Sequence, residues 1–190
     1  MEIIIKTDNS ELLICKHKSV QLTLKCIDEV EYLLYEKPEI KFFGKVCYQQ
    51  RNVGFFSDIV TGYKYSGQIM EAQPLTDNLR KLLIRVEKLC DVKFNAILVN
   101  EYEDGANYIG AHSDDVRSLE HCTIACISSS IRTFRIRDKN TKRIECDVDT
   151  IPTHLLVMNG GFQKEFTHEI PINKHKNDSR YSFTFRCHKE

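Results

Sequence analysis

Hydrophobic residues recur with a helical spacing in the first half of the chain. Between positions 74 and 90, leucine and valine return every three or four residues, which is the spacing of one helix face. Residues 74–90 are therefore predicted to form an amphipathic helix, with Pro74 near its start and its leucines packed against a sheet. A shorter helix is predicted at residues 27–35.

Beyond residue 94 the pattern changes to short runs rich in β-branched and aromatic residues, which is typical of strands. Turns are expected at Asp104-Gly105 and at Asn159-Gly160-Gly161. The strands are predicted at 96–101, 122–128, 133–137, 155–158, 164–168 and 180–187. This order favours a mainly β, or α+β, fold in which early helices back one side of an antiparallel double sheet.

The last predicted strand places two arginines on one face. Side chains alternate along a strand, so its polar residues share one face and its phenylalanines the other. The polar face carries Arg180, Ser182, Thr184 and Arg186. Buried guanidinium groups are costly without anionic partners. A dicarboxylate would supply such partners, since arginine binds carboxylates in a bidentate fork. An exposed edge strand with solvated arginines explains the same spacing equally well.

His112 and Asp114 form an H-x-D pair, and His168 follows much later in the chain. If the pair lies on a strand, both side chains enter one pocket. A third ligand must then come from a distant strand, and His168 fits that role. Two histidines and one carboxylate on one face of an octahedron leave three positions open, as in non-haem Fe(II) oxygenases. Because H-x-D pairs are frequent by chance, this prediction depends on the surrounding sequence.

That surrounding sequence resembles the AlkB-type 2-oxoglutarate/Fe(II)-dependent dioxygenases, most closely the members that repair alkylated duplex DNA. The motifs that carry the resemblance are Phe43-Gly44-Lys45, Arg51, Tyr63 to Gly67, Asn100-Glu101-Tyr102, Asp104-Gly105, Tyr108 to Gly110, His112 to Asp115, Leu155 to Asn159, Thr167 to Pro171 and Arg180 to Arg186. The resemblance implies one domain over residues 1–190 with a jelly-roll (double-stranded β-helix) core at about 94–188. Nucleotide-recognition elements are implied at about 41–70, and residues 1–40 match poorly.

The resemblance also implies roles for individual residues. The implied Fe(II) ligands are His112, Asp114 and His168, which with Arg186 make up the implied catalytic residues. The implied 2-oxoglutarate-binding residues are Asn100, Tyr102, Arg180, Ser182 and Arg186. Among these, Arg180 would bind the distal carboxylate with help from the Tyr102 hydroxyl. Asn100 and Arg186 would lie near the keto acid that chelates iron.

The implied substrate-binding residues are Phe43, Gly44, Arg51, Tyr63 and Tyr65. Tyr63 and Tyr65 would line the pocket for a flipped base, with Tyr65 stacked on the base opposite His168. Phe43 and Gly44 would form a hairpin tip that enters the duplex and fills the space the base leaves. The alternation of the two tyrosines also fits an ordinary half-buried strand.

The implied activity is oxidative demethylation of N-alkylated bases in DNA or RNA. It uses Fe(II), O₂ and 2-oxoglutarate and releases succinate, CO₂ and formaldehyde. A base inside a duplex must be flipped out to reach a buried iron. Two alternatives stay open: the same chemistry on a protein or lipid substrate, and an inactive nucleic-acid-binding module of the same fold.

Some positions depart from the family pattern. An acidic residue usually follows the iron-binding Asp by two positions, and here that position is Val116. Loss of this acceptor would weaken recognition of a base with a positive charge or an exocyclic amine. Ser182 stands where Asn is common, and Gln50-Arg51 replaces a Pro-Arg. The loop at 137–146 is shorter than in the duplex-acting members, which would shift preference toward single strands.

Composition narrows the possible partners and location. With 27 basic and 27 acidic residues the formal net charge is zero, which argues against massive nonspecific nucleic-acid binding but permits a local basic patch. The eight cysteines are irregularly spaced without a C-x-x-C, so reduced thiols are expected. No signal peptide or membrane-length segment is recognised. We therefore expect a monomer without membrane association, located inside the cell: in the nucleus or cytoplasm, or in a nucleoid or virus factory.

Overall fold

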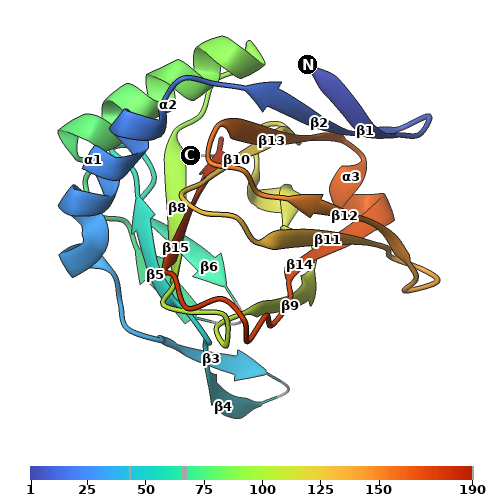
Figure 1. Ribbon diagram of the computed structural model, residues 1–190. Helices are drawn as coiled ribbons and strands as arrows, with labels where there is room; N and C mark the ends of the chain where they lie inside the picture. Colours follow the sequence, from blue (N-terminus) through green and yellow to red (C-terminus); the bar gives the residue numbers. More distant parts are fainter. Residues whose placement is uncertain (43, 66–67, 190) are drawn as a thin grey trace.

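The computed structural model describes residues 1–42, 44–65 and 68–189, and its main body consists of two antiparallel sheets packed face to face (Figure 1). In the order of pairing, the larger sheet contains β1 (Glu2–Lys6), β2 (Ser10–Lys16), β13 (His154–Gly160), β10 (Ile124–Ser128), β15 (Arg180–Arg186), β8 (Ala96–Tyr102) and β5 (Asn52–Phe56). The smaller sheet contains β12 (Ile144–Asp149), β11 (Thr133–Asp138), β14 (Phe166–Ile170) and β9 (Ile109–His112). This architecture confirms the predicted mainly β, jelly-roll fold.

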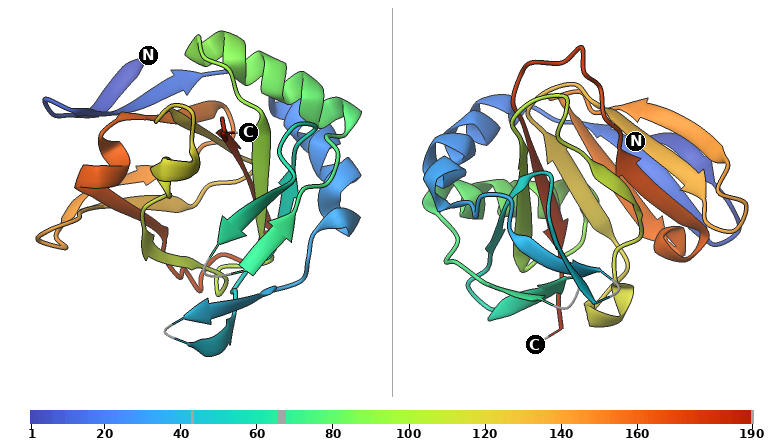
Figure 2. Two further views of the ribbon diagram at one scale, coloured as in Figure 1. Left: turned by 180° about the vertical axis from the view of Figure 1, so that it is seen from behind. Right: turned by 90° about the horizontal axis from the view of Figure 1, so that it is seen from below.

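Two helices cover the outer face of the larger sheet, as predicted (Figures 1 and 2). Helix α2 (Asp77–Cys90) buries Leu79, Leu82, Leu83 and Val86 against that sheet. It begins three residues after Pro74, because the Thr76 side chain accepts a hydrogen bond from the Leu79 N–H and caps the helix. The phenylalanines of β15 belong to the same apolar layer.

The prediction of a helix at residues 27–35 was wrong in its placement. Helix α1 covers Val20–Val30, with Thr23, Cys26 and Val30 buried at helical spacing. A single 3₁₀ turn (Glu31–Leu33) follows, and the chain is extended at Leu34. Tyr35 then forms an isolated bridge with Val53, which removes it from any helix.

The predicted strands of the second half exist, with shifted ends. The largest shift affects residues 164–168, where a short helix, α3 (Phe162–Glu165), precedes β14. Nine strands in the described part of the chain were not predicted: β1, β2, β5, β9, β12 and the four strands of two separate hairpins. Strand β2 was overlooked because its run Leu12-Leu13-Ile14 is buried on both faces and shows no alternation.

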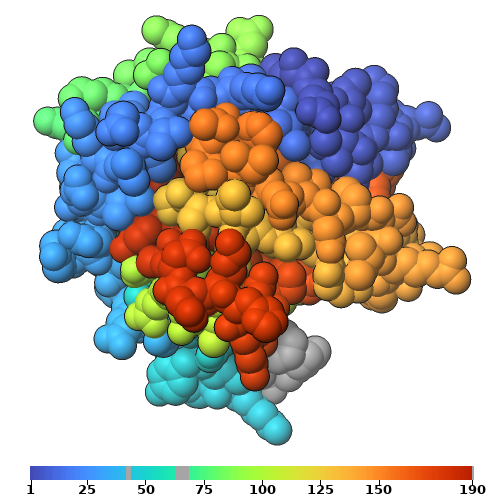
Figure 3. Space-filling view, viewed as in Figure 1, coloured from blue at the N-terminus to red at the C-terminus, as the bar shows by residue number. Residues whose placement is uncertain are grey.

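The two hairpins lie outside the two main sheets. They are β3 (Glu39–Phe42) with β4 (Lys45–Tyr48), and β6 (Gly62–Tyr65) with β7 (Gln68–Glu71). The β3–β4 hairpin projects from the lower edge of the molecule, in the ribbon and in the space-filling view (Figures 1 and 3). Gly44 follows β3 with a φ of +76°, a conformation that favours glycine. Phe43 and the side chains of Tyr63 and Tyr65 lie outside the described part of the structure.

None of the helices within the described ranges has the length and apolar character needed to cross a membrane.

Candidate active site

A cavity lies between the two sheets, with an empty volume of about 710 Å³ that includes its open mouth. Both sheets contribute to its walls, and the β4–β5 connection and β7 close part of its rim. Its apolar lining residues are Val53, Met70, Leu98, Ile109, Phe134, Met158 and Ile170. Its polar lining includes most of the site residues that the sequence predicted: Arg51, Asn100, Tyr102, His112, Asp114, His168, Arg180, Ser182 and Arg186.

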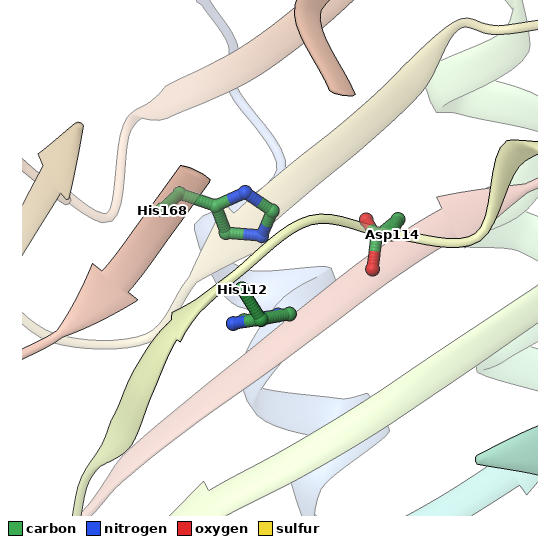
Figure 4. Close-up of side chains that lie close together, drawn as sticks. All are labelled: His112, Asp114 and His168. Atoms are coloured by element: carbon green, nitrogen blue, oxygen red, sulfur yellow. The ribbon is translucent and has the colours of Figure 1, made fainter. Parts of the chain in front are cut away.

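His112, Asp114 and His168 converge within this cavity (Figure 4). One possible ligand atom from each residue lies within 4.8 Å of the others. His112 ends β9 and is paired directly with His168 on β14, so the two imidazoles share one face of the smaller sheet. Their ring centroids are 4.4 Å apart. The set offers two nitrogens and one carboxylate oxygen, which suits a divalent first-row metal.

The expectation that a strand carries both members of the H-x-D pair holds only for His112, because β9 ends there. Asp114 lies in the following loop, where its main-chain N–H donates to Gln163 Oε1 at 2.9 Å. The Ser113 hydroxyl donates to the Phe166 carbonyl at 2.8 Å. These two bonds replace the strand ladder and turn Asp114 toward the histidines. Gln163, which the sequence analysis missed, is 3% exposed on α3.

The charges around Asp114 keep it ionised. Arg186 Nη2 lies 2.6 Å from Asp114 Oδ1, and each side chain is only 5% exposed. Burial alone would raise the pKa of Asp114, but the charge and hydrogen bond of Arg186 together with the two nearby histidines outweigh it, and the pKa falls to about 2. Burial lowers the pKa of His112 and brings that of His168 to about 3. Both imidazoles are therefore neutral at pH 7, the state in which histidine binds metals.

Two further observations fit a bound metal ion. Asp114 Oδ2 is buried and has no hydrogen-bond partner among the described residues. A buried acceptor without a partner is costly, and a metal ion would satisfy it. The His112 ring is oriented by the contact between its Nδ1 and the Gly110 carbonyl at 2.9 Å, which leaves Nε2 for a ligand.

Arg180 forms a second charged feature of the cavity. It is 1% exposed on β15, which lies between β10 and β8, so the alternative of an exposed edge strand is wrong. Its guanidinium lies 5.1 Å above the Tyr102 ring, and its Nε donates to Thr150 Oγ1 at 3.4 Å. Its Nη1 is buried without a partner among the described residues. A buried cation in this state provides a site for an anionic ligand group.

The remaining polar residues make contacts inside the cavity. Arg51 Nε donates to Asn100 Oδ1 at 2.8 Å, and both side chains are buried. Ser182 Oγ lies 3.2 Å from Cys126 Sγ. Burial raises the pKa of Tyr102, so its hydroxyl stays protonated and able to donate.

Val116 stands two residues after Asp114, where an acidic residue was expected from the family pattern. Its apolar side chain offers no acceptor to a ligand. Val116 begins a short 3₁₀ turn and packs against the core between the sheets. The neighbouring Asp115 is exposed and its carboxylate binds the Arg117 guanidinium at 2.8 Å. Asp115 therefore does not replace the missing acidic residue.

Comparison with known proteins identifies the family. The profile of the 2OG-Fe(II) oxygenase superfamily matches residues 14–186. The DNA oxidative demethylase ALKBH2 of Mus musculus is 32% identical over 167 residues, which are 83% of this chain and 70% of that protein. The chain belongs to the AlkB-type dioxygenases. This membership implies Fe(II), 2-oxoglutarate and O₂ as its cofactors, and the His-Asp-His cluster agrees with it.

Further relatives of the AlkB type match over shorter shares of their length. ALKBH2 of Homo sapiens is 30% identical over 83% of this chain and 64% of that protein. The alpha-ketoglutarate-dependent dioxygenase alkB homolog 3 of Homo sapiens is 31% identical over 74% of this chain and 53% of that protein. The chain thus spans between about half and about two thirds of these human relatives. The solved structure of OsALKBH1 has the same fold, with a TM-score of 0.59, 14% identity, and coverage of 98% of this chain and 100% of that one.

Proposed function

We propose that this protein is an oxidative dealkylase of N-alkylated nucleic-acid bases, with Fe(II) held by His112, Asp114 and His168. The observation that carries this proposal is that the three ligand groups converge in the same cavity as Arg180, whose buried Nη1 has no partner among the described residues. Support for a nucleic-acid substrate comes from relatives that are described as DNA oxidative demethylases. DNA is therefore the first substrate to test, and RNA the second.

Each protein group has a defined task in this proposal. When bound, Fe(II) with 2-oxoglutarate and O₂ supplies the oxidation that removes the alkyl group. The neutral imidazoles and the ionised Asp114 provide ligands, and Arg186 keeps that carboxylate charged. Arg180 binds the distal carboxylate of 2-oxoglutarate, and Tyr102 donates a hydrogen bond beside it. The apolar walls limit the access of water to the reacting groups.

The target base enters from the side of the two hairpins. Arg51 and Met70 line the cavity there, and Met70 pairs with Tyr63 across the β6–β7 hairpin. Lys41 and Lys45 are exposed on the β3–β4 hairpin, where they can contact phosphates. The predicted roles of Phe43 and Gly44 at the tip of that hairpin belong to the same proposal.

His112→Ala is expected to abolish turnover while leaving the fold intact. The variant loses one of three protein ligands, and His112 is only partly buried and makes a single side-chain hydrogen bond. The assay is anaerobic loading with Fe(II), followed by oxygen, 2-oxoglutarate and methylated DNA or RNA oligonucleotides, single- and double-stranded. Formaldehyde release from at least one oligonucleotide is expected for the wild type and none for the variant. Succinate formation by the variant at the wild-type rate would refute the metal assignment.

Gln163→Leu is expected to weaken metal binding by roughly tenfold to a hundredfold, in the range seen for residues that orient metal ligands. The substitution removes the acceptor that fixes the Asp114 main chain. The measurement is titration of the metal-free protein with Mn(II). Lys164→Leu is the control, because this neighbour on α3 is exposed. Equal affinities for the two variants would show that Gln163 does not position Asp114.

A further inference from the structure

Gln49 is a buried amide in the wall between two cavities. It follows β4, is 5% exposed, and lines the active-site cavity. It also lines a second cavity of about 920 Å³, open solvent included, bordered by the two hairpins. Met70 is the other residue that both cavities share. Gln49 therefore borders both the cavity at the hairpins and the cavity that holds the metal cluster.

The backbone of Gln49 is fixed, and its side-chain acceptor is not used by the described residues. The Gln49 main-chain N–H donates to the Pro38 carbonyl at 3.0 Å, which fixes the backbone. Its Oε1 is buried and has no hydrogen-bond partner among the described residues. A buried acceptor without a partner costs free energy unless a ligand provides a donor. Arg51, two residues later, lines the same cavity and is fixed by Asn100.

The residue two positions after the proposed metal ligand Asp114 offers the cavity no hydrogen-bond acceptor. Val116 occupies that position and packs into the core, and Asp115 binds Arg117 at the surface. Among the described residues that line the cavity, Gln49 Oε1 is a buried neutral acceptor not already engaged in a protein hydrogen bond. An exocyclic amine of a base can donate to such an oxygen, whereas an exocyclic carbonyl cannot.

We propose that Gln49 determines base specificity by accepting a hydrogen bond from the exocyclic amine of the target base. Gln49 then distinguishes a base with an amine next to its alkylated ring nitrogen from one with a carbonyl at that place. This inference rests on the proposed function and deepens it.

The test compares two oligonucleotides whose target bases differ at the exocyclic group next to the methylated nitrogen, and also in the C5 methyl and in charge, so the change in preference between wild type and variants is the readout. One carries 3-methylcytosine and the other 3-methylthymine; each ring is methylated at N3, beside an amine in the first and a carbonyl in the second. Wild type is expected to have the higher kcat/KM on 3-methylcytosine. Gln49→Met, which has no acceptor, should lower that kcat/KM about tenfold and change the other little. Gln49→Glu, which only accepts, should widen the preference about tenfold.

Two further measurements distinguish recognition of the base by Gln49 from a purely structural role of this residue. The dissociation constants of both oligonucleotides, measured by fluorescence anisotropy on metal-free protein, should shift in the same direction as the kcat/KM values. The ratio of the kcat/KM values on the two oligonucleotides is the second readout, because a general loss of 2-oxoglutarate turnover in a variant cancels from this ratio. Gln50→Met is the matched control, because Gln50 is exposed and, among the described residues, its side chain bonds only to the Tyr48 carbonyl.

The outcomes distinguish this inference from the function on which it rests. If wild type demethylates 3-methylcytosine but both Gln49 variants keep its preference within twofold, the role of Gln49 is refuted and the dealkylase proposal stands. If wild type acts on neither oligonucleotide and on no other methylated base, the proposed function itself fails.

Discussion

Asp114→Ala is expected to lower the free energy of unfolding of the metal-free protein by about 3 to 5 kcal/mol and to abolish turnover. The carboxylate lies 2.6 Å from Arg186, and both side chains are 5% exposed. Its removal deletes the ion pair between Asp114 and the buried Arg186 guanidinium, in a place that water barely reaches. Urea denaturation of the metal-free variant measures this loss separately from the loss of the metal.

A double variant identifies the cause of the instability. Asp114→Leu combined with Arg186→Met replaces the buried ion pair by apolar side chains, and such replacements are often neutral for stability. It should recover most of the free energy of unfolding while remaining inactive. An Asp114→Ala protein as stable as wild type would show that the ion pair contributes little to the fold.

Arg180→Met is expected to raise the KM for 2-oxoglutarate roughly a hundredfold, with a much smaller effect on kcat at saturation. A bidentate pair with a carboxylate contributes two charge-assisted hydrogen bonds, and each tenfold change in affinity corresponds to about 1.4 kcal/mol. Arg180 has the geometry for this role, because its Nη1 is buried without a partner among the described residues. Arg180→Lys keeps the charge but loses the fork, so an intermediate KM is expected.

The matched control for this prediction lies on the other sheet. Arg135 pairs with Asp147 at 2.7 Å, lies outside the cavity lining, and is more exposed than Arg180. Arg135→Met should leave the KM for 2-oxoglutarate unchanged. A wild-type KM in Arg180→Met would instead mean that the distal carboxylate binds elsewhere in the cavity.

The larger sheet shows why part of the site could be predicted. Strand β15 alternates strictly between polar and aromatic residues, so the face shared by Arg180 and Arg186 follows from the period of a strand. The sequence could not show that Arg186 pairs with Asp114, because that contact joins residues 72 positions apart. A dicarboxylate was expected to neutralise both arginines. Because Arg186 already has a carboxylate partner in the protein, Arg180 is the arginine that the dicarboxylate would neutralise.

The loop after β9 shows why other parts could not be predicted. The H-x-D pair suggested a continuous strand, but β9 ends at His112. The Asp114 main-chain N–H donates to the side chain of Gln163 instead of to a neighbouring strand. Such bonds between distant residues leave no periodic signal. Gln49 was overlooked for the same reason, since its position between two cavities depends on where the hairpins pack against the sheets.

The most direct test of the metal site is a crystal structure of the anaerobic complex with Fe(II) and 2-oxoglutarate, with diffraction recorded on both sides of the iron absorption edge. A single anomalous peak is expected within bonding distance of one nitrogen each of His112 and His168 and one oxygen of Asp114, with the distal carboxylate of 2-oxoglutarate on Arg180. An iron peak away from these three side chains, or a cosubstrate that does not contact Arg180, would contradict it.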